Sequence, residues 1–480
     1  MPPHYRRDAL LLFGLLAFAF AYFYQIGGWN ENSRFDTIFA IVQEGRFSID
    51  SILNDPGTVT GDISHFDGHF YSDKPVGPAA LGAILYKPLY LIKLDFHHGS
   101  INPVRKILTY VIIGIPSAFA GALIYLLCLY LSGSRFRSYV VAFSVTLGTL
   151  YFPFSLVFFS HQFTSALLFC AFILIFFLNE RPDKWRMGYA FLLGWLLGWA
   201  LISEYEAGII IVILVGYYFY VLSRNRNYRQ ILLFILPILG GLFPVLLQMA
   251  YNRVCFGNFW GLSYTHLSNL HFNTSMSQGF MGIHWPNLAV LFYMTFHPTA
   301  GIFWESPFLL LFIPGLVCMF VKRRLRVEAI VAMAIIASSF IIMSGYYQWW
   351  GGWSVGPRFI IPVLPYFCLP LIFVPKRLTW PLVVLGLFSF CQMLIVAAST
   401  AETPDTWVNK ISSVGFFEYT NIYSYCLKEL MAGRFTMNLA TFFLGIKSWN
   451  SLIPFLVVIG VVTSSFFLLG NYRNWSLKER

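Results

Sequence analysis

Long apolar stretches alternate with short polar segments along the whole chain, and this pattern predicts a bundle of helices that cross a membrane. Apolar runs of about 20 residues recur from end to end, which is the length needed to cross a bilayer. The first run, Ala9 to Gly27, is too long and too aromatic for the core of a cleaved signal peptide. The pattern predicts twelve spans, near 9–27, 107–132, 138–158, 162–179, 187–203, 206–223, 230–251, 301–321, 327–345, 358–375, 379–398 and 452–471.

Lys and Arg gather in short clusters between these spans, and such clusters mark loops that face the cytoplasm. The clusters are Arg6–Arg7, Arg135 with Arg137, Arg181 to Arg186, Arg224 to Arg229, Lys322 to Arg326, Lys376–Arg377, and the tail with Arg473, Lys478 and Arg480. An even number of spans must separate any two cytoplasmic clusters. The interval from Arg7 to Arg135 holds three apolar stretches, so one of them should not cross.

The stretch Pro75–Lys93 is the one that we expect to lie on the membrane. Lys87 sits within its apolar run, and a cluster of acids and histidines precedes it. We therefore predict an amphipathic helix at the outer interface, with Lys87 and Lys93 reaching the lipid headgroups. Both termini are then cytoplasmic.

The predicted topology divides the chain into five segments. Residues 1–27 form the N-terminus and first span, 28–106 a large external loop, 107–398 a transmembrane core with an external loop at 252–300, 399–451 a further external segment, and 452–480 the last span and tail. Nearly all acids fall outside, whereas the span centres are almost free of charge. Transporters tend to place ionisable residues at mid-membrane, so the pattern favours chemistry at the outer surface.

Composition agrees with this topology. The 480 residues are 58% hydrophobic and 11% charged, against roughly 25% charged residues in soluble domains. The net charge of +11 is explained by the cytoplasmic loops, so we expect no nucleic-acid partner. The seven cysteines have no disulfide spacing, although a bridge between the external Cys255 and Cys426 is left open.

Trp29–Asp50, directly after the first span, is the first candidate for chemistry. Asn32 and Asp36 share one face if the segment is helical, and Glu31 and Arg34 share the adjacent face. The competing interpretation is a solvated interfacial helix with an Arg–Glu pair.

Thr60–Pro75 is the second candidate, with three acids, two histidines and a lysine. Metal binding by Asp62, His65, Asp67 and His69 is conceivable, but their spacing matches no standard metal loop. A positioned carboxylate with a phosphate-binding Lys74 is the simpler hypothesis, so no metal or other cofactor is assigned.

Two further groups lie at outer span ends. His161 and the run Ser203–Glu206 fall in short loops, where helix-end roles compete with functional ones. The stretch Tyr346–Pro362 combines aromatic residues and glycines with Arg358. It is either an aromatic belt or a site in which Arg358 holds phosphate and aromatic faces receive sugar rings or prenyl chains.

Together these elements resemble the GT-C glycosyltransferases. More narrowly, they are similar to the protein O-mannosyltransferase and aminoarabinose-transferase group and to bacterial phospholipid-carrier-dependent glycosyltransferase-like membrane proteins. The resemblance rests on WNxNSR from Trp29, TGDxxxxxGHxYSDKPxG from Thr60, SEY from Ser203 and WGGxxxGPR from Trp350, and it runs from about residue 25 to about residue 375.

The resemblance implies an all-α, GT-C-like bundle of about twelve transmembrane helices with juxtamembrane helices in the first external loop. It implies transfer of a sugar from a polyprenyl-phosphate donor in the cell membrane, by inverting displacement on the external or periplasmic face, with a carboxylate as general base. Lys74 matches the family's phosphate-contacting lysine, and we expect Arg34, Arg358 and His161 to assist it. The expected substrate contacts are Asp73, His69, Tyr71, Glu204, Tyr205, Trp350 and Trp353.

One departure bears on the base. The better-known families have Asp-Glu where this chain has Asn30-Glu31, and an amide cannot accept a proton as a base. We therefore place Asp36 first as general base, Glu31 second and Asp62 third. Pro75-Val76-Gly77 also replaces the family's Pro-Pro-Leu, so the local turn should differ.

The sequence leaves open whether the acceptor is a glycan, a lipid or a protein. The segment 399–451 is the candidate for recognising it. Two other functions compete with transfer. One is a flippase or transporter of a lipid-linked glycan precursor, which needs the phosphate site but no base. The other is a catalytically degenerate paralogue, suggested by Asn30.

Overall fold

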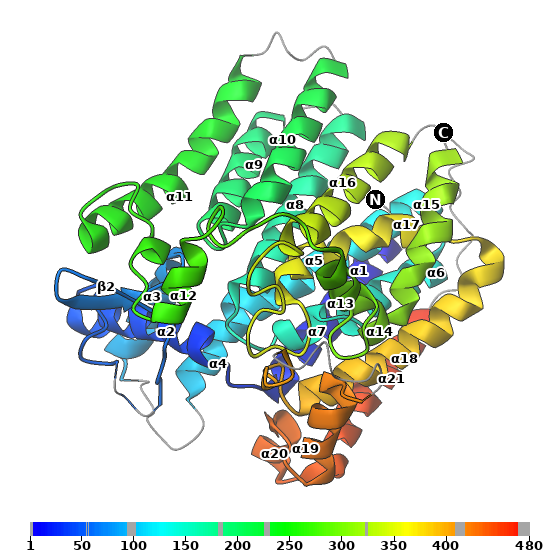
Figure 1. Ribbon diagram of the computed structural model, residues 1–480. Helices are drawn as coiled ribbons and strands as arrows, with labels where there is room; N and C mark the ends of the chain where they lie inside the picture. Colours follow the sequence, from blue (N-terminus) through cyan, green and yellow to red (C-terminus); the bar gives the residue numbers. More distant parts are fainter. Residues whose placement is uncertain are drawn as a thin grey trace.

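Helices make up most of the chain, and every segment predicted to cross the membrane contains one (Figure 1). The computed structural model describes residues 3–53, 55, 57–93, 102–180, 186–224, 231–321, 325–408 and 418–468. The helices in the predicted spans are α1 (Pro3–Tyr22), α4 (Pro103–Thr109) continuing through a π-helical turn into α5 (Ile115–Ser132), α6 (Arg135–Leu147), α8 (Ser160–Glu180), α9 (Arg186–Leu201), α10 (Ala207–Arg224), α11 (Leu232–Phe256), α15 (Phe312–Val321), α16 (Arg326–Met343), the 3-10 helix Arg358–Phe367 with α17 (Cys368–Ile372), α18 (Thr379–Ala398) and α21 (Leu452–Leu468).

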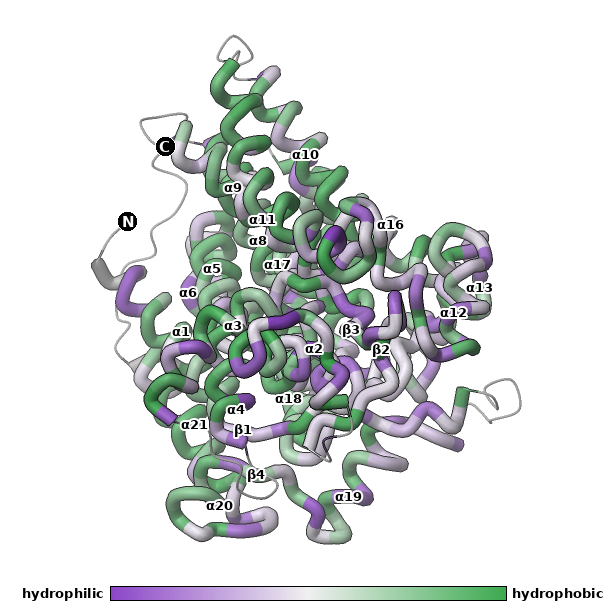
Figure 2. Tube along the Cα trace, turned by 90° about the vertical axis from the view of Figure 1, so that its left-hand side faces the viewer, coloured by the Kyte–Doolittle hydropathy of each residue, from purple (hydrophilic) through white to green (hydrophobic). Residues whose placement is uncertain are grey.

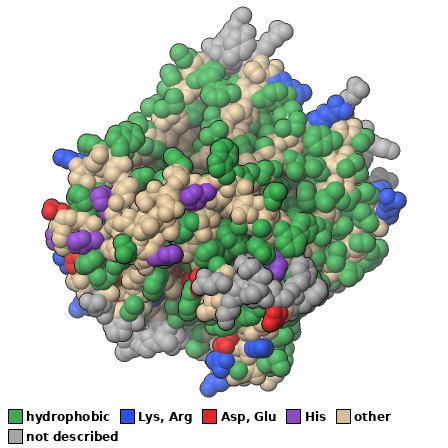
Figure 3. Space-filling model, in the orientation of Figure 1, with side chains coloured by type: hydrophobic (Ala, Val, Ile, Leu, Met, Phe, Trp, Pro, Cys, Tyr) green, Lys and Arg blue, Asp and Glu red, His purple; other side chains and the backbone are tan. Residues whose placement is uncertain are grey.

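Among the described residues, seven helical stretches are long and apolar enough to cross a bilayer. They are Pro103–Ser132, Ser160–Glu180, Ala207–Arg224, Leu232–Phe256, Arg326–Met343, Lys376–Ala398 and Ser448–Phe467. Pro307–Val321 and Arg358–Ile372 are apolar but shorter. The prediction of a helical, polytopic membrane protein is confirmed. In Figure 2 the helices α5, α9 and α11 are mostly hydrophobic, and Figure 3 shows hydrophobic side chains over a broad area of one face.

Two predicted spans are broken rather than continuous. The segment predicted at 138–158 leaves helix after Leu147 and resumes only in α7 (Tyr151–Phe154). The segment predicted at 301–321 consists of α14 (Ile302–Glu305), the 3-10 helix Pro307–Leu311 and α15. The two breaks lie side by side, because Ser306 Oγ donates a hydrogen bond of 2.8 Å to the carbonyl oxygen of Gly148.

The first external loop folds as α2 (Trp29–Phe39), a π-helical turn (Ala40–Glu44), the strands β2 (Ile63–Phe66) and β3 (His69–Ser72), and α3 (Gly77–Leu91). The two strands pair antiparallel, with Phe66 opposite His69. Asp67 and Gly68 connect them with φ values of 51° and 79°, which is the backbone that a tight hairpin turn requires.

The helix α3 occupies the stretch that we expected to lie on the membrane. Its 15 residues extend only about 22 Å, too short to cross the hydrocarbon core. It packs on α2, where the Tyr86 ring lies edge-on to Phe39 at 5.4 Å. Lys87 lies on its exposed side, but the Lys87 Nζ is 3.4 Å from the carbonyl oxygen of Val42. That bond ties α3 to the π-helical turn.

The elements in the other segments predicted to be external are α12 (Leu270–Met276), α13 (Leu288–Thr295), α19 (Leu427–Met431), β4 (Met437–Asn438) and α20 (Leu439–Leu444). The strand β1 (Phe23–Tyr24), which follows α1, pairs antiparallel with β4. The Tyr22 hydroxyl also donates a hydrogen bond of 2.5 Å to the Ser451 carbonyl oxygen. The late external segment is therefore fastened to the end of the first helix.

The opposite ends of α1 and α21 also meet. Arg135 Nε lies 2.6 Å from Asp8 Oδ2, and Arg135 Nη2 donates to the carbonyl oxygen of Phe466 at 3.2 Å. The start of the first helix and the end of the last therefore lie at one end of the bundle, as an even number of crossings requires.

No disulfide joins Cys255 and Cys426, the two cysteines predicted to be external. Cys255 and Cys426 are both free and buried. Cys255 packs in a small cluster with Tyr251 and Phe256, whereas Cys426 belongs to the main hydrophobic core. The bridge that the sequence left open does not form.

Helices α9 and α11 lie in backbone contact along one edge of the bundle (Figure 1). A Cβ built on Gly194 would lie 1.8 Å from the carbonyl oxygen of Pro237, and one on Gly240 would lie 2.0 Å from that of Phe191. Small residues that permit such an approach are a common basis of helix association in membranes.

This contact predicts that Gly194→Ala destabilises the protein by about 1–3 kcal/mol, because the added methyl group overlaps the α11 backbone. The measurement is thermal unfolding in detergent. Gly188→Ala is the matched control, since Gly188 lies on the same helix and a Cβ added there would meet no atom within 4 Å. Equal melting temperatures for the two variants would contradict the close contact.

Candidate functional site

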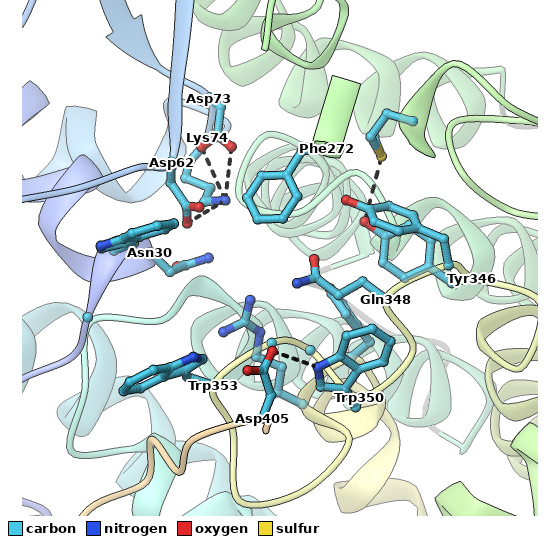
Figure 4. A pocket seen from close by; sticks show the side chains of 18 of the residues that line it. Asn30, Asp62, Asp73, Lys74, Phe272, Tyr346, Gln348, Trp350, Trp353 and Asp405 are labelled. Atoms are coloured by element: carbon cyan, nitrogen blue, oxygen red, sulfur yellow. Dashed lines mark hydrogen bonds and ion pairs between the residues drawn. The ribbon is translucent and has the colours of Figure 1, made fainter. Parts of the chain in front are cut away.

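A cavity of about 740 Å³ opens among the first external loop, α12 and two later loops. Asn30, Asp62, Asp73 and Lys74 of the first loop line it. The later loops contribute residues 346–348 and 350–353 with Arg358 and Phe359, and then Glu402, Asp405, Thr406 and Val408. In Figure 4, Asp62, Asp73 and Lys74 face Trp350, Trp353 and Asp405 across the opening. This cavity is the candidate active site.

Lys74 lies between two carboxylates. Its Nζ is 2.8 Å from Asp62 Oδ2 and 3.1 Å from Asp73 Oδ1. Burial raises the pKa of Asp73 to about 6, although the Lys74 charge opposes this rise. Burial lowers the pKa of Lys74, but the charges of Asp62 and Asp73 outweigh burial, so the net shift is upward. The ammonium charge expected to hold phosphate is thus already matched by two acids.

Arg358 is the cavity cation that has no acidic partner among the described residues. Its guanidinium carbon lies 5.0 Å from the Phe159 ring centroid and 5.6 Å from that of Phe359. The buried Arg358 Nε finds no hydrogen-bond acceptor in the described chain. Gly351, with φ of 86°, makes room for it, since a Cβ there would lie 2.7 Å from Arg358 Cγ. This guanidinium is available to an anionic ligand.

One carboxylate oxygen of Glu204 accepts from three donors. Arg34 Nη2 lies 3.2 Å and His161 Nδ1 3.1 Å from Glu204 Oε1, and the Ser160 hydroxyl also donates to it. His161 and Glu204 line the cavity. His161 Nε2 has no hydrogen-bond partner in the described structure, so the carboxylate orients the ring and leaves Nε2 to a ligand.

Arg34 lies behind the wall rather than in it. Its side chain is 1% exposed and is absent from the cavity lining. Besides Glu204, it donates to Asn30 Oδ1 at 3.3 Å and to the Pro75 carbonyl oxygen at 3.3 Å. The expected contact of Arg34 with a donor phosphate does not fit this position.

Of the three predicted bases, only Asp62 lines the cavity. Glu31 is held by Arg105 Nη2 at 2.7 Å and by the Phe158 amide at 2.8 Å. Asp36, placed first from the sequence, is fully buried away from the cavity. Burial raises its pKa to about 7. Asn32 and Asp36 share a face of α2 as the spacing predicts, but that face points into the protein.

Some of the side chains expected to contact substrate also line the cavity, and others do not. Asp73, Glu204, Trp350 and Trp353 line the cavity, whereas His69, Tyr71 and Tyr205 do not. His69 Nδ1 lies 2.8 Å from Asp50 Oδ2 at the exposed hairpin. The Tyr71 and Tyr205 rings pack against Phe256 and Tyr264. In the described part of the chain, no three His, Cys, Asp or Glu side chains are grouped to hold a metal ion.

Several cavity residues were missed from the sequence. Trp29 lines the cavity with its ring packed over Gly61, where an added Cβ would lie 2.6 Å from the indole. Glu402 and Asp405 reach the cavity from the segment after α18, and α12 contributes Phe272. Glu402 and Asp405 are two of the four acids in the segment 399–451, and no local pattern separates them from the other two.

Two cavity carboxyl groups hold protons near neutral pH. Burial, assisted by the charge of Glu204, raises the pKa of Glu206 to about 8. Burial also raises the pKa of Glu402 to about 7, against the opposing effects of the Gly28 backbone and Arg358. The cavity therefore carries less negative charge than its acids suggest.

Of the comparisons with known proteins, the one with solved structures bears on the fold. No family model matches the sequence, and no curated protein is significantly similar to it. Among solved structures, the chain is similar to ArnT from Cupriavidus metallidurans bound to undecaprenyl phosphate, with a TM-score of 0.52 and 11% identity. The match covers 97% of this chain and 74% of that one. The chain thus has an ArnT-like polytopic fold.

The Glu31–Arg105 pair predicts that Glu31→Gln lowers the free energy of unfolding by roughly 1–3 kcal/mol, because the buried guanidinium loses its counter-charge. The measurement is denaturation in detergent. Glu429→Gln is the control, since its partner Arg434 is exposed and such pairs contribute about 1 kcal/mol or less. A Glu31→Gln protein of full stability without turnover would instead favour Glu31 as base.

The raised pKa of Glu206 predicts that the free energy of unfolding depends on pH. Its pKa rises from 4.5 to about 8 on folding, so the folded state keeps a proton that the unfolded chain releases in this interval. Stability should therefore fall as pH rises from about 5 to about 8. Glu206→Gln should flatten this fall in melting curves, whereas Glu429→Gln should not. An unchanged pH profile in Glu206→Gln would assign the proton elsewhere.

Proposed function

We propose that the protein is a membrane glycosyltransferase that moves a sugar from a polyprenyl-phosphate donor to an acceptor at the outer face of the membrane. The observation that carries the proposal is the unpaired Arg358 guanidinium, among the described residues, in a cavity whose opposite wall bears Asp62 and Asp73. The ArnT-like fold supports a lipid-carrier donor, since the ArnT structure holds undecaprenyl phosphate.

The carrier phosphate binds Arg358 in this proposal, with His161 Nε2 as a second contact. A guanidinium matches phosphate oxygens with paired donors. Arg358 and His161 both pack against the Phe359 ring, at 5.6 and 5.2 Å, so the two lie at the same end of the cavity. The negative charge that develops on the leaving phosphate is stabilised there.

Asp62 is the proposed general base. The acceptor oxygen attacks the anomeric carbon opposite the phosphate, the carbon–oxygen bond to the phosphate breaks, and the acceptor proton passes to the carboxylate. Lys74 holds Asp62 and Asp73 in position. Because the Lys74 ammonium occupies the space between the two carboxylates, the proposed step uses no metal ion there.

Apolar side chains form a surface along which the prenyl chain can reach the end of the cavity that holds Arg358. Leu267, Phe272 and Met276 line the cavity beside α12. Exposed apolar side chains continue from that side, including Leu270 and Phe280. A carrier lipid can follow this surface while its phosphate reaches Arg358.

The test is release of polyprenyl phosphate by the purified, reconstituted protein from a panel of polyprenyl-phosphate sugars. Asp62→Asn should lower release by about 10²–10⁴-fold, and Arg358→Ala by about 10²–10³-fold. Asp67→Asn and Arg434→Ala are matched controls. Asp67 lies exposed in the same loop with positive φ, which Asn tolerates, and Arg434 lies outside the cavity.

Three outcomes decide the proposal. Release that depends on both Asp62 and Arg358 supports it and identifies the donor. Binding of the donor without release, with acceptor extracts added, would favour a flippase or a degenerate paralogue. Full release from Asp62→Asn would overturn Asp62 as base.

A further inference from the structure

The cavity has two chemically different sides. Beside α12 the lining is apolar, with Leu267, Phe272 and Met276. On the side of the later loops, tryptophans alternate with acids: Trp350 and Trp353 lie next to Asp405 (Figure 4). A prenyl chain suits the first side. It does not suit the second, where it would strip water from carboxylates without replacing their hydrogen bonds.

Trp353 presents an open ring to this second side. It is 55% exposed, and no other described aromatic ring packs against it. Trp349, four residues earlier, is 7% exposed and packs on Tyr293 and Trp407. The same aromatic run therefore contains one tryptophan used for packing and one left available to a ligand.

The backbone around Trp353 is built to hold it in place. Gly351 and Gly352 precede it with φ values of 86° and 73°, a conformation that side-chain-bearing residues rarely adopt. Gly351 also lies against Arg358, the proposed phosphate contact. The loop thus sets the open indole beside the place where the donor sugar is attached.

Asp405 supplies the polar part of this wall. Its Oδ2 accepts a hydrogen bond of 3.3 Å from Trp350 Nε1, which fixes the carboxylate. No described residue donates to Asp405 Oδ1. Glu402 lies in the same segment, and its Oε2 lies against Gly28, where a Cβ would approach it to 2.6 Å. Asp405, with one oxygen that no described residue donates to, and Glu402 therefore line the same cavity as the open ring.

We propose that Trp353, Asp405 and Glu402 form a subsite for a carbohydrate acceptor, so that the sugar is transferred to a glycan. The apolar face of a pyranose ring packs on the indole, while its hydroxyl groups form hydrogen bonds with the carboxyl groups of Asp405 and Glu402. An open aromatic face with fixed acceptors beside it matches this mixed surface. The inference rests on the proposed transferase, because it assigns the second substrate of that site.

Binding of neutral disaccharides tests the subsite without any turnover. Cellobiose, mannobiose and N,N′-diacetylchitobiose are presented to the protein in nanodiscs, with a Ser/Thr pentapeptide as the competing acceptor class. Saturation-transfer NMR gives the affinities. We expect at least one disaccharide to bind, and Trp353→Ala to weaken it about 5–10-fold, the loss expected for an aromatic contact. Asp405→Asn should weaken it by a similar factor.

Trp260→Ala is the matched control. Trp260 is exposed in an external loop but does not line the cavity, so its loss should leave disaccharide binding unchanged. Binding that Trp353→Ala leaves intact would overturn the subsite, as would the absence of any disaccharide binding. Peptide binding that depends on Trp353 would also overturn it, in favour of a protein acceptor.

The same measurements separate this inference from the proposed function. Disaccharide binding through Trp353 without release from any donor would defeat the transferase and leave a glycan site. Release that depends on Asp62, with no disaccharide binding, would keep the transferase and defeat the carbohydrate acceptor.

Discussion

The buried ion pair between Arg34 and Glu204 holds the outer part of the molecule together. The two side chains are 1% and 5% exposed, at 3.2 Å, so α2 cannot leave the turn between α9 and α10 without stranding a buried charge. Glu204 also orients His161, and Arg34 binds the carbonyl oxygen of Pro75, which follows Lys74. This ion pair thus fixes the position of the first loop relative to the membrane helices.

The cavity cations Lys74 and Arg358 differ in whether acidic side chains neutralise them. Lys74 is neutralised by two aspartates, whereas Arg358 faces aromatic rings within the described chain. An anion is therefore drawn toward Arg358 rather than Lys74, although both residues lie in motifs that carry the family resemblance. The protons on Glu206 and Glu402 remove two negative charges that would otherwise repel it.

The sequence was sufficient for the helical, polytopic class and for a helix within Pro75–Lys93, because the length of an apolar run is a local property. It was insufficient for the breaks at Gly148 and Ser306, which depend on a contact between two distant helices. For the site, the motifs pointed to Asp62, Lys74 and Arg358, which line the cavity, and to Asp36 and Arg34, which do not. The sequence could not separate the two groups, because spacing shows which residues share a helix face but not which way that face points. Asp405 could not be linked to Trp350 from any local pattern.

The pairing of β1 with β4 gives the chain a fixed order of assembly. The Thr436 hydroxyl donates to the Tyr24 carbonyl oxygen across 412 positions of sequence, so the first helix must wait for its partner strand. At a synthesis rate of roughly 5–20 residues per second, that wait is about 20–80 s. During it, the exposed edge of Phe23–Tyr24 has no strand to pair with. The newly made protein therefore passes through a period in which the helices before β4 exist but β1 is unpaired, and the cavity gains the wall of Glu402 and Asp405 only after α18 has been made.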